Sequence, residues 1–251
     1  MQAAAPIKDD ISAVSAAHNK TKKFFATGKT KPLSFRITQL LNLKKGIISM
    51  DKDLKEAVKA DLGREGFVTW LCEISLLLSE IDQTIANLRK WTRPISVDTP
   101  MFLGPAKSKI VYEPLGVVCV IGSWNFPLFT VLAPLIGVIA AGNCAVIKPS
   151  EIAPVTLRKV KALITRSLEM SAYSCIEGQV EVAKALTSTK FDMICFTGST
   201  QKGKLVAAAA GQNLVPCLLE LGGKSPAIVD ESANLDLAAK KIVFGKFVNA
   251  G

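Results

Sequence analysis

The sequence predicts an α/β fold, in which a Rossmann-like parallel sheet with helices on both faces follows an N-terminal helical segment. Two observations support this prediction. Before residue 94 apolar residues recur every three or four positions, whereas after Pro114 apolar runs of strand length alternate with helical stretches. Continuous apolar strands between helices are typical of a parallel sheet covered on both faces. The 251 residues are 49% hydrophobic, which allows a substantial core and excludes a disordered protein.

The first third of the chain is predicted to form helices that act as a scaffold. Three short helices are expected up to Gly63. The clearest helix runs from Phe67 to Trp91, where apolar residues repeat with helical spacing, and Pro94 marks its end.

The sheet is predicted from five apolar runs. A loop at 94–104 and an exposed strand in KSKIVYEP precede them. The runs are GVVCVIG, CAVIKPS, DMICFTGS, VPCLLELGG and PAIVD, and the helices between or after them are expected near residues 127–141, 154–169, 180–189, 200–210 and 234–248.

The stretch between Glu113 and Lys148 carries no charged residue and is long enough for a membrane span. Asn125, Pro127 and Gly142 interrupt it, among other breaks. We therefore predict strand, turn, helix, turn and strand rather than a spanning helix, and no membrane segment.

Composition restricts the class of protein and its partners. The N-terminus shows no secretory or other targeting signal, so a cytoplasmic location is expected. The net charge of +10 is spread over scattered lysine pairs, which favours approach of an anionic ligand and does not indicate nucleic-acid binding. Neither a metal site nor a disulfide framework is predicted from the six cysteines, Cys72, Cys119, Cys144, Cys175, Cys195 and Cys217, which we interpret as reduced and mostly buried thiols. The single histidine, His18, is expected at the surface.

Polar residues and glycines follow each predicted strand, where ligands of open parallel sheets bind. The turn at 198–203 suits a pyrophosphate, or it is simply a tight turn. Lys148 and Glu151 suit a ribose, or they form a surface ion pair. Asn125 serves either as a helix cap or as an amide donor to an oxyanion. Glu220, beside two glycines, is either a structural carboxylate or a general base with a shifted pKa.

Four stretches in this order, EPLGVVCVIGSWNFP, AAGNCAVIKPSE, FTGSTQKG and LELGGKSP, resemble the aldehyde dehydrogenase superfamily, and the short helical N-terminus resembles its class 3, fatty-aldehyde branch. The resemblance implies NAD or NADP as cofactor and a small-molecule aldehyde as substrate. It implies Asn125 as the oxyanion donor and Glu220 as the general base. The residues that it places at the cofactor are Trp124, Lys148, Glu151, Gly198, Ser199, Gly203, Leu221 and Gly222.

The resemblance also implies a division of the chain. Residues 1–93 form helices packed on the cofactor domain, 94–113 belong to an oligomerisation arm, 114–219 form the NAD(P)-binding domain and 220–251 begin the catalytic domain. In this family a cysteine thiolate attacks the aldehyde through a thiohemiacetal, and that cysteine is expected just after Gly251. We therefore expect a truncated chain that is inactive alone and a homodimer when full length. The alternative is a catalytically inactive dinucleotide-binding or interaction module.

Overall fold

The computed structural model describes residues 7–249 and is built on one parallel sheet. Its five strands lie in the order β5-β4-β3-β6-β7. The strands are β3 (Val117–Ile121), β4 (Cys144–Lys148), β5 (Tyr173–Cys175), β6 (Met193–Gly198) and β7 (Cys217–Leu221). Every residue of β3 and β4 is buried, which explains why these strands are uninterrupted apolar runs. The predicted fold class is confirmed.

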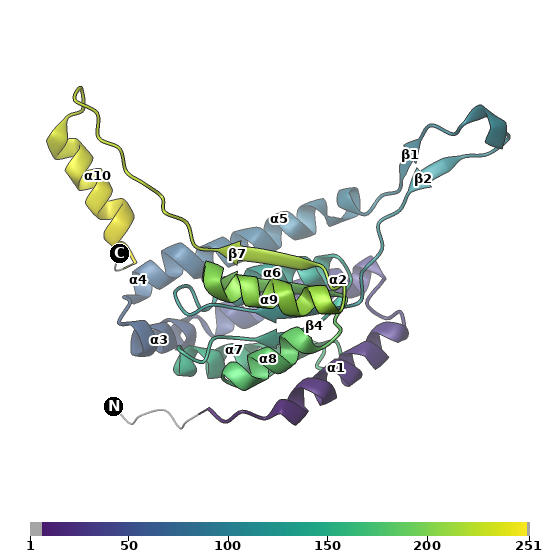
Figure 1. Ribbon diagram of the computed structural model, residues 1–251, viewed down its shortest axis with the longest axis horizontal. Helices are drawn as coiled ribbons and strands as arrows, with labels where there is room; N and C mark the ends of the chain where they lie inside the picture. The colour runs from purple at the N-terminus through teal and green to yellow at the C-terminus, as the bar shows by residue number, and fades with distance from the viewer. Residues whose placement is uncertain (1–6, 250–251) are drawn as a thin grey trace.

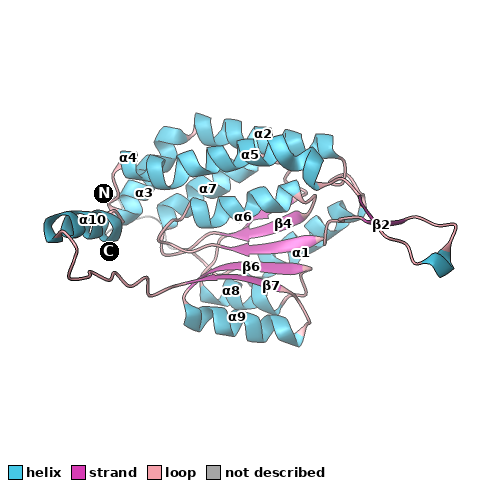
Figure 2. Ribbon diagram, turned by 90° about the horizontal axis from the view of Figure 1, so that it is seen from above, coloured by secondary structure: helices cyan, strands magenta, loops and turns pink. Residues whose placement is uncertain are grey.

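Helices cover both faces of this sheet (Figures 1 and 2). One face packs against α6 (Phe129–Ala140) and α7 (Pro154–Ser167). The other packs against α8 (Val180–Ser188), α9 (Thr200–Gln212) and α1 (Ile11–Ala26), the first helix of the chain. The continuous apolar runs of the strands are therefore enclosed by amphipathic helices on both sides.

The other N-terminal helices form a second layer outside α6 and α7 (Figure 2). They are α2 (Leu33–Ser49), α3 (Asp51–Leu62), α4 (Gly66–Thr69) and α5 (Ser75–Trp91). The predicted long helix from Phe67 to Trp91 is interrupted, because residues Trp70–Ile74 form a π-helical turn, η1, between α4 and α5. Such a turn has no distinct hydrophobic period, so the pattern could not predict it.

A hairpin extends away from the body of the molecule (Figure 1). Strand β1 (Ile95–Val97) pairs antiparallel with β2 (Ser108–Ile110), and a short 3₁₀ helix, η2 (Met101–Leu103), lies at the tip. The strand predicted in KSKIVYEP is thus present, whereas β1 lies in a segment predicted as loop. The tip exposes large apolar side chains, with Met101 96% and Phe102 84% exposed.

Acidic side chains from the N-terminal segment cap the helices that follow β3, β4 and β5. Glu73 accepts two backbone N–H bonds from the start of α6 at 2.8 and 2.9 Å. Asp61 accepts two backbone N–H bonds from the first turn of α7, at 3.1 and 2.7 Å. Asp9 accepts two backbone N–H bonds at the start of α8, at 2.6 and 3.5 Å. None of these three helices receives a side-chain bond from its own N-cap residue. The N-terminal segment therefore supplies the negative charge that these helix ends favour.

The opposite end of α6 is held by a buried arginine. Arg36 of α2 donates to the carbonyls of Thr30, Lys31 and Ala140 at 3.3, 2.7 and 3.1 Å. Ala140 is the last residue of α6, whose C-terminal end carries partial negative charge. Helix α6 thus has a carboxylate at its N-terminal end and a guanidinium at its C-terminal end.

Beyond the sheet the chain departs from one sequence prediction. The run PAIVD (226–230) was predicted as a strand, but it forms no strand and extends away from the sheet before α10 (Leu235–Phe247) (Figure 1). No strand of residues 7–249 lies beside it to complete a ladder, so its β-propensity is not realised. Across these residues no helix is long and apolar enough to cross a membrane, and α6 has only 12 residues.

Candidate functional site

The sheet topology places one edge of the molecule as the candidate site. From β3 the chain moves to β4 and β5 on one side, then returns to β6 and β7 on the other. Ligands of open α/β sheets bind at such a switch point, beyond the carboxyl ends of the strands. Here the switch lies between β3 and β6. The segments that follow these two strands contain Asn125 and Ser199, so two predicted site segments meet where the topology favours a ligand.

Asn125 lies in the turn between β3 and α6, and its side-chain amide has a defined orientation. Ser123 Oγ donates to Asn125 Oδ1 at 2.6 Å, which leaves the Nδ2 group as the outward donor. The residue is exposed, as is Trp124 beside it. The alternative role as a helix cap is wrong, because Glu73 holds the start of α6 instead. An exposed amide donor in this position suits stabilisation of a developing oxyanion.

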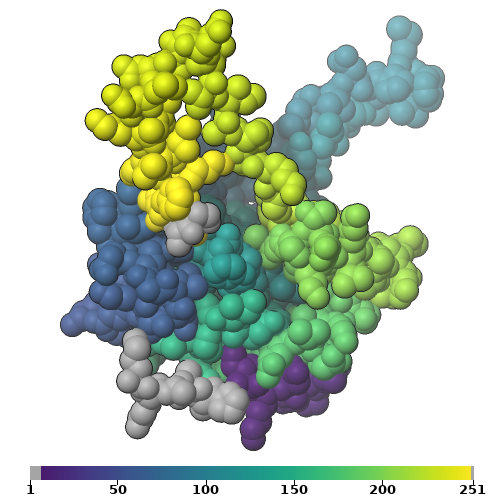
Figure 3. Space-filling view, turned by 60° about the vertical axis from the view of Figure 1, so that its left-hand side comes forward, coloured from purple at the N-terminus to yellow at the C-terminus, as the bar shows by residue number. Residues whose placement is uncertain are grey.

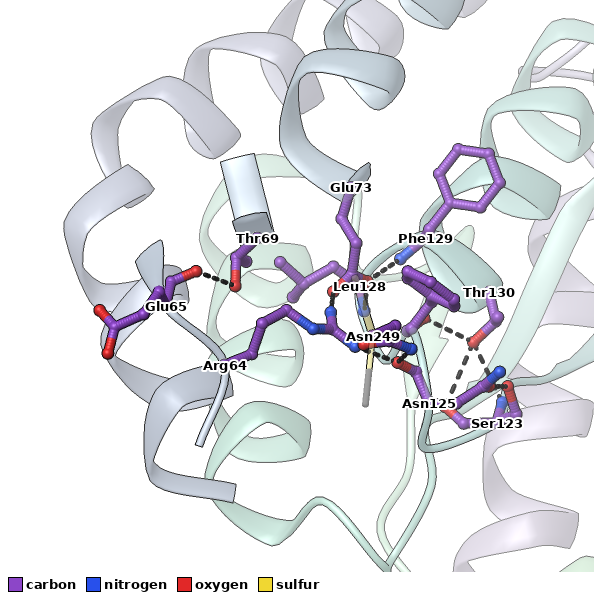
Figure 4. A network of polar contacts seen from close by, with 11 residues as sticks. Arg64, Glu65, Thr69, Glu73, Ser123, Asn125, Leu128, Phe129, Thr130 and Asn249 are labelled. Carbon is purple, nitrogen blue, oxygen red and sulfur yellow. Dashed lines mark hydrogen bonds and ion pairs between the residues drawn. The ribbon is translucent and has the colours of Figure 1, made fainter. Parts of the chain in front are cut away.

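A buried ion pair supports this turn and was not predicted from the sequence (Figure 4). Arg64 Nη1 lies 2.5 Å from Glu73 Oε1, and the two side chains are 5% and 0% exposed. Arg64 also donates to the backbone carbonyl of Asn125. Burial raises the pKa of the Glu73 carboxyl, and the Phe129 N–H and the Arg64 charge oppose that shift. The one available signal in the sequence was a single acidic residue, Glu73, in the otherwise apolar stretch WLCEI.

The turn after β6 has the features expected of an anion site. Ser199 is the N-cap of α9, and its hydroxyl accepts from the Lys202 N–H at 3.3 Å. This cap is uncharged, in contrast to the acidic caps of α6, α7 and α8. The partial positive charge at the start of α9 is therefore not neutralised by its cap. Gly198, predicted as the first residue of the turn, is the last residue of β6.

Two glycines permit close packing around this turn. A Cβ on Gly203 would lie 2.6 Å from the Leu221 side chain, so glycine allows α9 to approach the end of β7. A Cβ on Gly198 would lie 2.5 Å from the Phe196 ring. Packing alone therefore explains why both positions are glycine. Their location beside the start of α9 also fits a bound pyrophosphate.

Lys148 and Glu151 form the predicted pair at the end of β4. Lys148 Nζ lies 2.6 Å from Glu151 Oε2, and the lysine side chain is only 2% exposed, whereas that of Glu151 is 28% exposed. The carboxylate therefore compensates the buried ammonium while remaining accessible. The pair is not a simple surface ion pair, and an accessible carboxylate at this edge fits a ribose hydroxyl.

Glu220 is placed differently from the prediction. It lies within β7, opposite Thr197 of β6, rather than after the strand. Glu220 is exposed on β7, which is an edge strand of the sheet. Leu221 and Gly222 are exposed beside it. β7 lies two strands from β3, which is roughly 10 Å across the sheet at the usual strand spacing. The role of Glu220 beside Asn125 at one reaction centre stays a prediction.

The end of the described chain returns to the Asn125 turn. Asn249 Nδ2 donates to the Asn125 carbonyl at 3.3 Å. Figure 3 shows the yellow C-terminal part of the chain above the rest of the molecule, with a teal region between the blue residues on the left and the green residues on the right. Asn249 thus lies toward the candidate site, whereas Ala250 and Gly251 lie outside the described residues.

The cysteines of the sheet do not provide an exposed nucleophile. Cys119, Cys144 and Cys195 are buried, and all six cysteines are free. Burial raises the pKa of Cys195 to about 11 and that of Cys144 to about 12, so their thiolate forms are scarce near neutral pH. His18 was predicted at the surface, but it is half-buried against the Phe191 ring at 4.7 Å, and this burial lowers its pKa.

The buried thiols give a first prediction. In the folded chain at about pH 8, N-ethylmaleimide is expected to leave Cys119, Cys144 and Cys195 largely unmodified, because burial disfavours the thiolate and blocks access. Mass spectrometry of peptides after brief labelling measures this, and labelling in denaturant provides the reference for complete reaction. Rapid labelling of Cys119 in the folded chain would contradict the buried assignment.

Comparisons with known proteins identify the family to which the chain is similar. A model of the aldehyde dehydrogenase family matches residues 4–251. The chain is 46% identical over 231 residues to 4,4'-diaponeurosporen-aldehyde dehydrogenase of Staphylococcus aureus, a match that covers 92% of this chain and 50% of that protein. It is 39% identical over 241 residues to the dimeric NADP-preferring aldehyde dehydrogenase of Mus musculus. This match covers 96% of this chain and 53% of the mouse protein. The chain thus spans about half the length of these curated relatives.

A solved structure shows the same fold. It is described as the substrate-bound state of Staphylococcus aureus AldH, and it matches with a TM-score of 0.91 and 45% identity over 95% of this chain and 52% of that one. Family 3 aldehyde dehydrogenases are also among the similar proteins, which agrees with the predicted class 3 resemblance. Since the family model covers nearly the whole sequence and the fold matches as well, this chain belongs to the aldehyde dehydrogenase family.

Proposed function

We propose that this chain is the cofactor-binding part of an enzyme that oxidises aldehydes to carboxylic acids with NAD or NADP. The observation that carries the proposal is the start of α9. This helix begins at the switch point of the sheet with the uncharged cap Ser199, whereas α6, α7 and α8 are capped by acidic side chains. A pyrophosphate is therefore favoured at α9 and repelled at the other three helix ends.

The residues around this helix end fit the rest of a dinucleotide. Glu151 would accept from ribose hydroxyls, and Lys148 would hold that carboxylate in place through its 2.6 Å contact. Trp124, Gly198, Gly203, Leu221 and Gly222 would complete the cofactor site. The cofactor, when bound, supplies the acceptor for the hydride. The similar mouse protein is named NADP-preferring, and the cofactor proposed for this chain is NAD or NADP.

Two side chains are proposed to act on the substrate. Asn125 Nδ2, with its oxygen end occupied by Ser123, would donate to the oxyanion that forms when a thiolate attacks the aldehyde. Glu220, exposed on the edge strand, would act as general base for the water that releases the acid. The thiolate is proposed to come from outside residues 7–249, because the sheet cysteines described above are poor nucleophiles.

The hairpin of β1 and β2 is proposed as an oligomerisation arm. Its tip exposes Met101 and Phe102, and large exposed apolar side chains indicate a contact surface. The similar mouse protein is named dimeric, which favours a homodimer for the complete enzyme. The division into N-terminal helices, arm, cofactor domain and start of a catalytic domain is part of the same proposal.

The proposed function predicts that the chain binds NAD or NADP without turning over aldehydes. Titration calorimetry with each cofactor is expected to show saturable binding, while steady NAD(P)H production from an aliphatic or aromatic aldehyde is expected to be absent. Extension of the chain through a complete catalytic domain, as in its relatives, is expected to give steady production. Absence of cofactor binding would reject the dinucleotide site, and turnover by the chain alone would reject the need for an external thiolate.

A further inference from the structure

The ion pair Arg64–Glu73 joins the N-terminal helices to the turn that carries Asn125. Arg64 precedes α4 and Glu73 lies in the π-helical turn η1, so both residues belong to the outer helical layer. Their side chains are almost completely buried, at 5% and 0% exposure. Two buried charges are costly to desolvate unless each is compensated by its partner and by further hydrogen bonds. Their partners therefore indicate what the pair does.

The pair makes four further contacts, and all four fall on the five residues 125–129. Glu73 Oε2 accepts the backbone N–H groups of Leu128 and Phe129 at 2.8 and 2.9 Å. Arg64 donates to the backbone carbonyl of Asn125, and its guanidinium lies 4.8 Å from the centre of the Phe126 ring. The pair thus holds both ends of one short turn. These contacts use backbone groups and one ring, and they leave the Asn125 side chain free.

The Asn125 amide is oriented separately, by the Ser123 hydroxyl. Figure 4 shows Arg64 and Glu73 on one side of the turn and Ser123 on the other. The backbone of Asn125 is therefore fixed from the outer helices, while its amide oxygen is fixed from within the turn. Together these contacts determine where the Nδ2 donor lies. Catalytic donors need such positional control, since small misplacements cost large factors in rate.

The π-helical turn is an independent observation that agrees with this role. Glu73 and Ile74 are consecutive in the chain, yet both are almost completely buried, at 0% and 1% exposure. The wider turn of η1 allows the apolar residue to enter the core while the carboxylate reaches the start of α6. Single π turns inside α-helices are frequent at functional sites.

We propose that Arg64 and Glu73 are positioning residues for the Asn125 amide donor, an inference that rests on the proposed function of Asn125. Arginine suits this task because its planar fork serves a carboxylate, a carbonyl and an aromatic face at once. Lysine offers a single charged group and no plane to stack on Phe126. The ion pair is thus assigned a role in the site as well as in capping α6.

The test uses the chain itself, labelled with ¹⁵N on asparagine and, in a second sample, uniformly. The variants are Glu73→Gln, Arg64→Lys and the double variant Arg64→Met with Glu73→Met. The double variant leaves no unpaired buried charge, so it is the one expected to keep the fold. Two quantities are measured: the ¹⁵N relaxation of the Asn125 side-chain amide, assigned through Asn125→Ala, and hydrogen exchange at the backbone amides of Leu128 and Phe129.

In the double variant the Asn125 amide is expected to become mobile, and exchange at Leu128 and Phe129 is expected to become at least about tenfold faster. Arg64→Lys is expected to leave exchange at these amides nearly unchanged while increasing the mobility of the Asn125 amide. A more mobile Asn125 amide together with unchanged hydrogen exchange would show that Arg64 positions Asn125 and does not merely help to cap α6.

The matched control is Asp61→Asn, which removes an analogous acidic cap from α7 and does not touch the Asn125 turn. It is expected to accelerate exchange at Val155 and Thr156 and to leave the Asn125 amide ordered. If the double variant accelerates exchange at Leu128 while the Asn125 amide remains as ordered as in the wild type, the positioning role is overturned. Neither measurement needs cofactor or turnover, so failure to bind NAD(P) would reject the proposed function without affecting this result.

Discussion

The Ser199→Asp variant is expected to lose NAD and NADP affinity by at least about tenfold, because a carboxylate at the start of α9 repels the cofactor pyrophosphate. Aspartate caps helices as well as serine does, and its charge favours the helix end. The free energy of unfolding is therefore expected to stay within about 0.5 kcal/mol of the wild type or to rise. Titration calorimetry and urea unfolding measure the two quantities on the same sample.

Asn234→Asp is the matched control for this substitution. Asn234 is the N-cap of α10 and accepts from the Leu237 N–H at 3.0 Å, so the same charge is added at a comparable helix start away from the proposed cofactor site. This variant is expected to bind NAD(P) as the wild type does. Unchanged cofactor affinity in Ser199→Asp would mean that the pyrophosphate does not lie at α9, and the assignment of Gly198 and Gly203 to the cofactor would fail with it.

The Arg36→Met variant is expected to lower the free energy of unfolding by roughly 3 kcal/mol, since two buried carbonyls and one partly buried carbonyl lose their donor at an order of 1 kcal/mol each. Arg36 is 8% exposed and bonds Thr30, Lys31 and Ala140. Methionine keeps much of the side-chain volume, which separates the lost hydrogen bonds from a packing defect. Removal of a positive charge from the C-terminal end of α6 lowers the free energy of unfolding further.

Urea unfolding followed by circular dichroism measures this loss. Arg166→Met is the control, because Arg166 is an exposed arginine near the end of α7, where a change of less than about 0.5 kcal/mol is expected. A loss of similar size in both variants would show that net charge, and not the buried hydrogen bonds of Arg36, is responsible.

Patterns of local sequence were sufficient for the regular elements of the sheet and its helices. The apolar runs that became β3 and β4 are buried along their whole length, and a fully buried strand cannot be mistaken for a half-exposed one. Strand β5, with only three residues, was missed because a strand this short carries almost no periodic signal. The PAIVD run failed for the opposite reason, because its composition favours a strand but no described strand lies beside it.

The sequence also indicated which residues lie at or near the carboxyl ends of the strands, and therefore the candidates Asn125, Lys148, Glu151, Ser199 and Glu220. That inference needs only chain order and the rule that parallel strands end at one edge. It could not determine the state of each side chain. Lys148 is buried against Glu151, whereas Glu220 is exposed because β7 is the edge strand. Burial depends on strand order, which is a property of the assembled sheet.

Only the tertiary structure revealed the contacts between distant segments. Glu73 caps a helix that starts 56 positions later, and Arg36 donates to a carbonyl 104 positions away. No local pattern marks such pairs, because the partners are backbone groups that every residue possesses. Helix ends must be satisfied by some group, and the N-terminal segment supplies it from across the molecule. The chain thus determines its elements by local periodicity, while the charges that hold the Asn125 turn are decided by packing of the outer helices on the sheet.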